Sequence, residues 1–140
     1  MANNTNPIFV LQPETITCTI AAANTARDGS GTLVTLYPTA AVDRRLEKVV
    51  FTSAQATAAA SSAMVGRVFI SDTAGANPRL IGEVAIATAT ASATVVGATA
   101  NIAFSGGLPV ASGQIVYVTQ SVYAGVQDQF HVYAVVGAYE

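Results

Sequence analysis

Residues 15–20 read Thr-Ile-Thr-Cys-Thr-Ile, with threonine at every odd position and an apolar residue at every even one. Successive side chains of a β-strand point to opposite faces, so this period of two predicts a strand with Ile16, Cys18 and Ile20 on a buried face. Cys18 is then expected to be a small core hydrophobe rather than a reactive thiol. Because it is the only cysteine, the chain forms no intrachain disulfide, which suits folding in a reducing cytoplasm.

Comparable patterns recur along the 140 residues, interrupted by turn-forming Gly, Pro and Asn. The segment 53–63 is interpreted as a loop or a strand extension, and 105–109 as a turn between strands. About eight short strands without a helical pattern predict an all-β fold, an antiparallel β-sandwich or barrel, with a jelly-roll sandwich preferred. The expected strands are 15–20, 32–37, 44–53, 64–71, 79–87, the Ala/Thr tract to residue 104, 114–123 and 129–138.

The composition indicates one folded domain. Apolar residues make up 51% of the chain, and a chain of this length buries roughly 70% of the surface that its unfolded form exposes. We expect a single β-sandwich domain over residues 13–140. Residues 1–12 are polar and then turn apolar at Ile8, Phe9 and Val10, which predicts an N-terminal arm that docks on a neighbour.

Charge is scarce and unevenly spread. Charged residues make up 10% of the chain, against roughly 25% in an average soluble protein. After Glu83 the next charged residue is Asp128. Residues 84–104 are long enough to span a membrane as a helix, but hydroxyl residues alternate with alanine from Ala87 to Thr94, which favours a strand. With a net charge of −2 we expect neither nucleic acid nor a membrane as partner.

Residues suited to catalysis are few. His131 is the only histidine, and the one acidic residue near it in sequence is Asp128. No serine lies in a nucleophile-elbow motif, and no spacing typical of metal ligands occurs. The Gly29–Gly31 stretch lacks the following residues of a phosphate-binding loop. We therefore expect no enzyme activity, no metal and no cofactor.

Tyrosines gather in the last quarter of the chain, where charge is almost absent. Tyr117 and Thr119 alternate with valines, so an outward polar face is predicted there. Such faces are typical of protein interfaces. The tyrosines could instead only cap the core, or stack on carbohydrate. The candidate interface residues are Ile8, Phe9, Val10, Tyr117, Thr119, Tyr123, His131, Tyr133 and Tyr139.

Three stretches of the sequence carry a resemblance: Asn3–Val10, Ala23–Leu33, and Val65–Asp72 together with Arg79–Val84. Over its first two thirds the chain resembles small virion structural proteins of tailed bacteriophages. The resemblance implies a β-sandwich made in the host cytoplasm that decorates the capsid surface. Its partners would be the major capsid protein and further copies of itself, as a homotrimer. The alternative is a module of a tail or fibre that recognises host surface glycan. No active site comes with the family.

Overall fold

The computed structural model describes residues 13–38, 42–55 and 59–138. In these ranges it contains eight strands and two short 3₁₀ turns, η1 (Thr73–Gly75) and η2 (Val126–Asp128). The strands are β1 (Pro13–Ile20), β2 (Val34–Tyr37), β3 (Arg44–Ser53), β4 (Met64–Ile70), β5 (Arg79–Ile86), β6 (Thr99–Val110), β7 (Val116–Gln120) and β8 (Phe130–Ala138).

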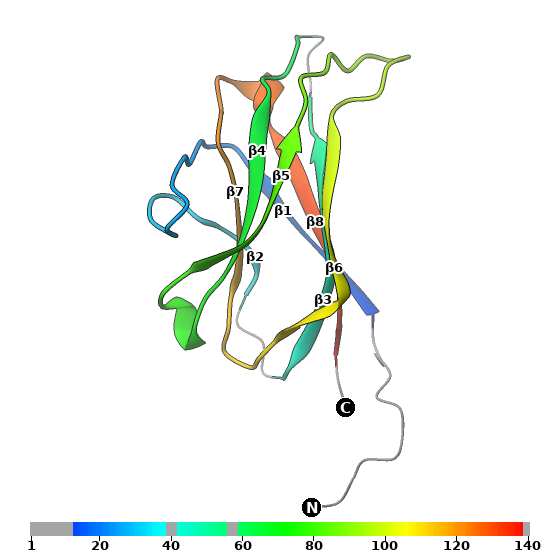
Figure 1. The fold of residues 1–140 in the computed structure, drawn as a ribbon. Coiled ribbons are helices and arrows are strands. Elements are labelled where there is room, and N and C mark those ends of the chain that lie inside the picture. The colour runs from blue at the N-terminus through cyan, green and yellow to red at the C-terminus, as the bar shows by residue number, and fades with distance from the viewer. Residues whose placement is uncertain (1–12, 39–41, 56–58, 139–140) are drawn as a thin grey trace, which may run out of the picture.

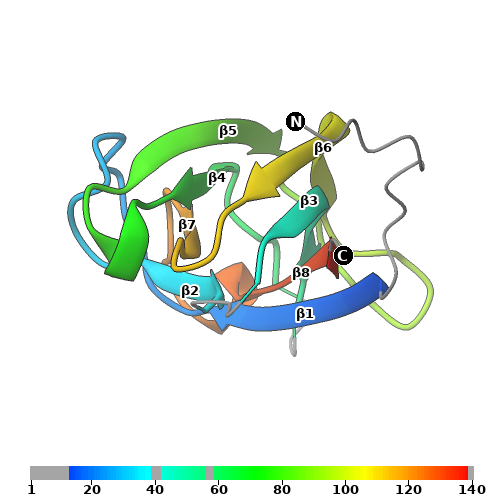
Figure 2. The same cartoon turned by 90° about the horizontal axis from the view of Figure 1, so that it is seen from below.

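The strands form two four-stranded sheets that face each other (Figures 1 and 2). One sheet has the order β1-β8-β3-β6 and the other β2-β7-β4-β5. The first strand thus pairs with the last, the second with the seventh, the third with the sixth and the fourth with the fifth, all antiparallel. This nesting is the topology of a jelly roll. The predicted sandwich is confirmed, and the structure is not a barrel.

The core fills the space between the sheets. Most inward-facing side chains of the central strands are buried, for example Val132 and Val136 on β8 and Val118 on β7, each at most 1% exposed. On the edge strand β1, Ile20 is buried, whereas Ile16 and Cys18 are half-buried and pack against the core from its margin. The apolar residues of the stretch 15–20 therefore face the core as predicted, at the edge of the sheet.

Gly66 on β4 is required by close packing across the core. A Cβ atom there would lie 2.9 Å from the ring of Phe51, which is fully buried. We expect Gly66→Ala to lower the free energy of unfolding by roughly 1–3 kcal/mol through overpacking, as measured by chemical denaturation. The matched control is Ala85→Val on the exposed face of β5, which should change stability by less than about 0.5 kcal/mol. A Gly66→Ala protein as stable as wild type would refute this packing.

The Ala/Thr tract is where the strand prediction is wrong. β5 ends at Ile86 and β6 begins at Thr99, so residues 87–98 form a loop despite their period of two. A strand needs a partner ladder, and this tract finds its hydrogen bonds elsewhere: the amide of Ala89 donates to Ser61 Oγ, and the amide of Ser61 to the carbonyl of Ala89. Its small side chains also leave little apolar surface to hold it against a sheet.

The Gly-containing stretch 105–109 also differs from expectation, because it lies inside β6 rather than between strands. The register against β3 shifts here, and Gly106 and Gly107 have φ values of 75° and 76°. A β-bulge with left-handed glycines explains why a turn-like sequence continues a strand, and Pro109 is tolerated because β6 is an edge strand.

Two predictions fall outside the described residues. The proposed arm, with Ile8, Phe9 and Val10, belongs to residues 1–12, and Tyr139 belongs to 139–140. Within the described ranges, no helix has the length and apolar character needed to cross a membrane.

Candidate interaction surface

Three loops meet at one end of the sandwich, at the top in Figure 1, where β3, β5 and β7 end. Their described residues are 54–55, 59–63, 87–98 and 121–129, and we call this surface the neutral loop end. Backbone hydrogen bonds join the loops: the amide of Ala54 donates to the carbonyl of Gln129 over 2.8 Å, and the amide of Ser61, in the same loop as Ala54, donates to the carbonyl of Ala89 over 2.8 Å. In sequence these three segments contain one charged residue, Asp128.

Asp128 is 0% exposed and holds two of the loops together. Its carboxylate accepts the amide of Ser62 over 2.6 Å, the Ser62 hydroxyl over 3.0 Å and the amide of Ala124 over 2.8 Å. Burial alone would raise the pKa of this carboxyl, but the hydrogen bonds from Ser62 and Ala124 outweigh it, so the pKa lies below its ordinary value. Asp128 therefore organises the neutral loop end and leaves its surface without charge.

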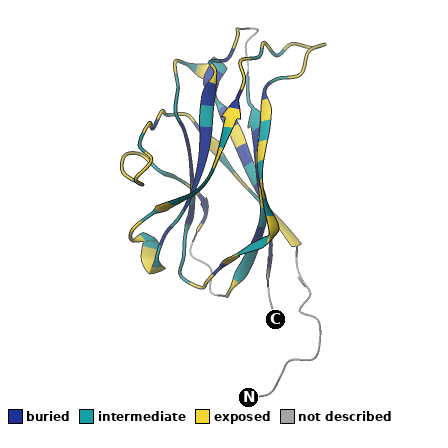
Figure 3. Cartoon of the chain, viewed as in Figure 1, coloured by how far each residue is buried: buried dark blue, intermediate teal, exposed yellow. Residues whose placement is uncertain are grey.

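Apolar side chains project from this end. Val96 is 87% exposed, Val95 is 53% exposed, and Val126 on the neighbouring loop is 51% exposed. Ser92 shapes the turn that presents the first two: its Oγ accepts the amide of Val95 over 3.1 Å, and its amide donates to the carbonyl of Val95 over 2.9 Å. The tip of this loop is exposed in Figure 3. These exposed apolar residues on an uncharged end make it the candidate interaction surface.

The opposite end of the sandwich is charged. The turn between β4 and β5 contains Asp72, which forms an ion pair with Arg79 and accepts a hydrogen bond from Asn77. Asp43, before β3, accepts the amide of Ser112 over 2.8 Å. The hydrogen bond from Asn77, followed by that from Arg79, outweighs desolvation and holds the pKa of Asp72 below its ordinary value. The two ends thus differ in charge: this end carries charged side chains, whereas the three segments of the neutral loop end contain only the buried Asp128.

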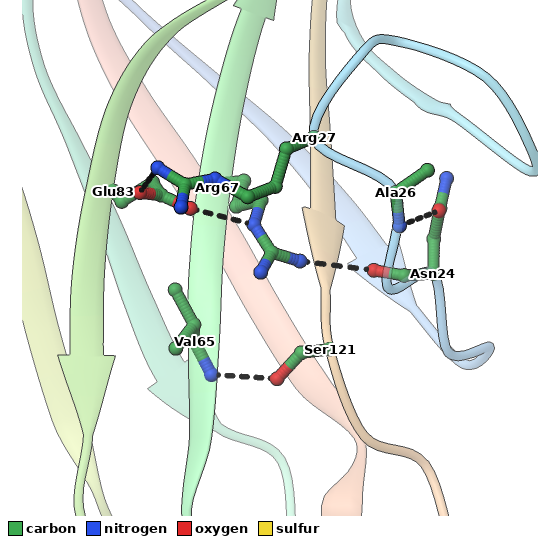
Figure 4. A network of polar contacts seen from close by, with 7 residues as sticks. All are labelled: Asn24, Ala26, Arg27, Val65, Arg67, Glu83 and Ser121. Atoms are coloured by element: carbon green, nitrogen blue, oxygen red, sulfur yellow. Dashed lines mark hydrogen bonds and ion pairs between the residues drawn. The ribbon is translucent and has the colours of Figure 1, made fainter.

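A third polar network fastens the connection between β1 and β2 to the outer face of the β2-β7-β4-β5 sheet (Figure 4). Arg67 on β4 donates from Nε to Glu83 over 2.8 Å and reaches across β7 to the carbonyl of Asn24 over 3.2 Å. Arg27 pairs with the other oxygen of Glu83 over 2.7 Å. Thr119, the cross-strand neighbour of Arg67, is only 1% exposed. This network belongs to the fold, and it leaves Thr119 unavailable to a partner.

The other candidate residues lie on separate surfaces. Tyr117 is half-buried on the same outer face as Thr119, with its hydroxyl close to the turn at Gly75. Tyr133 is half-buried and His131 exposed on the outer face of the other sheet, where the Thr19 hydroxyl lies 3.0 Å from His131 Nδ1. Tyr123, also half-buried, lies within the neutral loop end. The structure therefore does not bring the tyrosines together.

The sequence prediction missed Val95, Val96 and Val126 as surface residues. Val95 and Val96 belong to the Ala/Thr tract, whose alternation predicts a strand, so the sequence pattern does not place them outside. Val126 lies between two expected strands, where a single valine carries no signal of exposure. The signal that could have found them is the absence of charge between Glu83 and Asp128, which indicated a contact region without naming its residues.

Groups suited to chemistry stay apart in the described residues. No three side chains of His, Cys, Asp or Glu lie close enough together in them to hold a metal ion. Cys18 is half-buried, and burial raises the pKa of its thiol to about 11, so it is a neutral thiol at physiological pH.

Comparison of the chain with protein-family models, with curated proteins and with solved structures found no match.

Proposed function

We propose that this protein is a structural component of a bacteriophage virion that decorates the capsid by binding the major capsid protein through its neutral loop end. The observation that carries the proposal is the combination of exposed Val95, Val96 and Val126 with a surface free of charge. The buried centre of protein interfaces is depleted in charged residues and enriched in apolar contact.

The internal hydrogen bonds of this end support a binding role. Hydrogen bonds at Asp128 and Ser61 connect the loops in the separate chain, which lowers the conformational freedom lost on binding. On a shell that repeats the same site many times, a modest contact per copy is sufficient. The proposed arm of residues 1–12 would add a second attachment, which raises the effective concentration of the first.

Two further features favour a protein lattice as partner. The net charge of −2 gives no basic surface for phosphate. The tyrosines considered for glycan stacking, Tyr117, Tyr123 and Tyr133, lie on three different surfaces and so form no shared platform. Jelly rolls are known both in capsids and in lectins, so the fold by itself is compatible with either role.

The proposal is tested by counting copies in purified particles with quantitative mass spectrometry, using the major capsid protein as internal standard. Decoration of the shell requires on the order of hundreds of copies per particle, because the lattice offers its site repeatedly. A count matching the few copies of a tail or fibre component would reject the decoration role and favour glycan recognition.

A further inference from the structure

The sandwich has four edge strands, and they differ in how well they are protected against pairing with another chain. β5 carries Arg79 and Glu83 and a register shift against β4. β2 has only four residues and a shift against β7. Charges, short length and bulges are the usual devices that prevent edge pairing. These two strands are therefore protected edges.

β1 lacks these devices over residues 15–20. That stretch contains no charge, glycine or proline, and its register with β8 runs without a shift. Within the described ranges, β8 is the only strand that pairs with β1. Alternate backbone amide and carbonyl groups of β1 therefore face outward and are open to another strand.

The upper half of β6 matches this edge. Residues 99–104 are uncharged, and the bulge at Gly106 and Gly107 and the proline lie beyond them. Both segments have six residues with the same alternation, polar or small outward and apolar inward. Apart from Ile20, which is buried, the inward side chains are only half-buried on both edges: Ile16 and Cys18 on β1, and Ala100, Ile102 and Phe104 on β6.

Strand direction decides which edges can meet. If the neutral loop ends of all copies face the same shell, copies are related by an axis parallel to the strands. β1 and β3 then run toward the loop end and β6 runs away from it, so β1 of one copy meets β6 of the next antiparallel. Two β1 strands pairing antiparallel would instead point one loop end away from the shell. β2 also runs away from the loop end and could pair antiparallel with β1, but it has only four residues.

We propose that copies of this chain associate through antiparallel pairing of β1 residues 15–20 with β6 residues 99–104 of the next copy. The pairing covers the half-buried apolar side chains at both open edges and satisfies the outward backbone groups. It is a heterologous interface, in which two different surfaces meet and closure requires rotation. The strand-direction argument rests on the proposed function, whereas the assembly can be measured without particles.

The experiment uses analytical ultracentrifugation of the full chain and two variants, Ile16→Lys on β1 and Ile102→Lys on β6. In the separate chain each lysine can extend its charge into solvent at the open edge, whereas a neighbouring strand would bury that charge. Wild type should sediment as an oligomer of the 14.2 kDa chain, and each variant alone as a monomer. A mixture of the two variants should give a dimer, because one intact β1 edge and one intact β6 edge remain.

Other outcomes overturn the proposal. A wild-type monomer, or an oligomer that survives both substitutions, contradicts it, and a β6 variant that still associates while the β1 variant does not would indicate β1 pairing with itself.

If a variant fails to unfold cooperatively, hydrogen exchange of the wild-type chain takes its place: amides in 15–20 and 99–104 should gain protection as concentration rises. Equal exchange at all concentrations refutes the pairing. Oligomers that do not bind particles would refute the proposed function alone.

Discussion

Replacing Asp128 by alanine should lower the free energy of unfolding by about 2–5 kcal/mol, because hydrogen bonds to a charged group contribute about 1.5–3 kcal/mol each. The amides of Ser62 and Ala124 lose their acceptor in this variant, and the carboxylate that they share is fully buried. Urea denaturation followed by circular dichroism measures the effect.

The control is Asp28→Asn. Asp28 also accepts hydrogen bonds, from the amide and hydroxyl of Ser30, but it is exposed, so water replaces the lost acceptor. Its stability should stay within about 0.5 kcal/mol of wild type. Equal losses in the Asp28 and Asp128 variants would contradict the assigned role of Asp128.

The pH dependence of the Asp128→Ala effect follows from the lowered pKa of this carboxyl in the folded state. A depressed pKa stabilises the folded chain at pH values above the unfolded pKa of about 3.9, and that contribution is lost as the pH falls through the folded pKa. The stability difference between wild type and Asp128→Ala should therefore be constant near neutral pH and shrink below about pH 4. A difference that grows on acidification would contradict the hydrogen-bonded, ionised carboxylate.

Replacing Val95 and Val96 together by aspartate should reduce binding to particles that lack the protein by tenfold or more, which corresponds to about 1.4 kcal/mol. Both side chains are exposed, so folding is expected to tolerate the change. In a docked loop end, however, each carboxylate would be buried without a partner, and burying an unpaired charge is costly. Co-sedimentation of purified protein with particles measures the loss.

The matched control is Val42→Asp. Val42 is also an exposed valine, at 46%, but it precedes β3 at the charged end of the sandwich. This variant should bind like wild type. If Val42→Asp abolishes binding and the Val95 and Val96 substitutions do not, the shell is contacted by the opposite end.

The fold could be predicted from the sequence because a buried face imposes a period of two. Residues 15–20 and 130–136 show that period, and they form β1 and β8. Residues 87–94 have the same period without forming a strand. Alternation alone does not supply a partner strand. In this tract the Thr88 hydroxyl and the backbone amides of Ala89 and Ala91 donate hydrogen bonds to Ser61 and Gln55 instead.

The candidate surface was harder to predict than the fold, because it depends on which loops the topology brings together. The lack of charge after Glu83 was visible in the sequence, but the tyrosines that it highlighted lie on three surfaces. Thr119 faces outward as its alternation predicted, yet the side chain of Arg67 and the backbone at Asn24 adjoin it. That contact joins residues far apart in sequence and cannot be derived from local pattern.

The most direct test is an image reconstruction of intact particles by cryo-electron microscopy, at a resolution that shows strands. Density for the sandwich should repeat over the capsid surface, with the loops at residues 87–98 and 121–129 against the major capsid protein and the turn between β4 and β5 toward solvent. Density confined to a tail or fibre, or a sandwich seated on the shell by its charged end, would contradict the account.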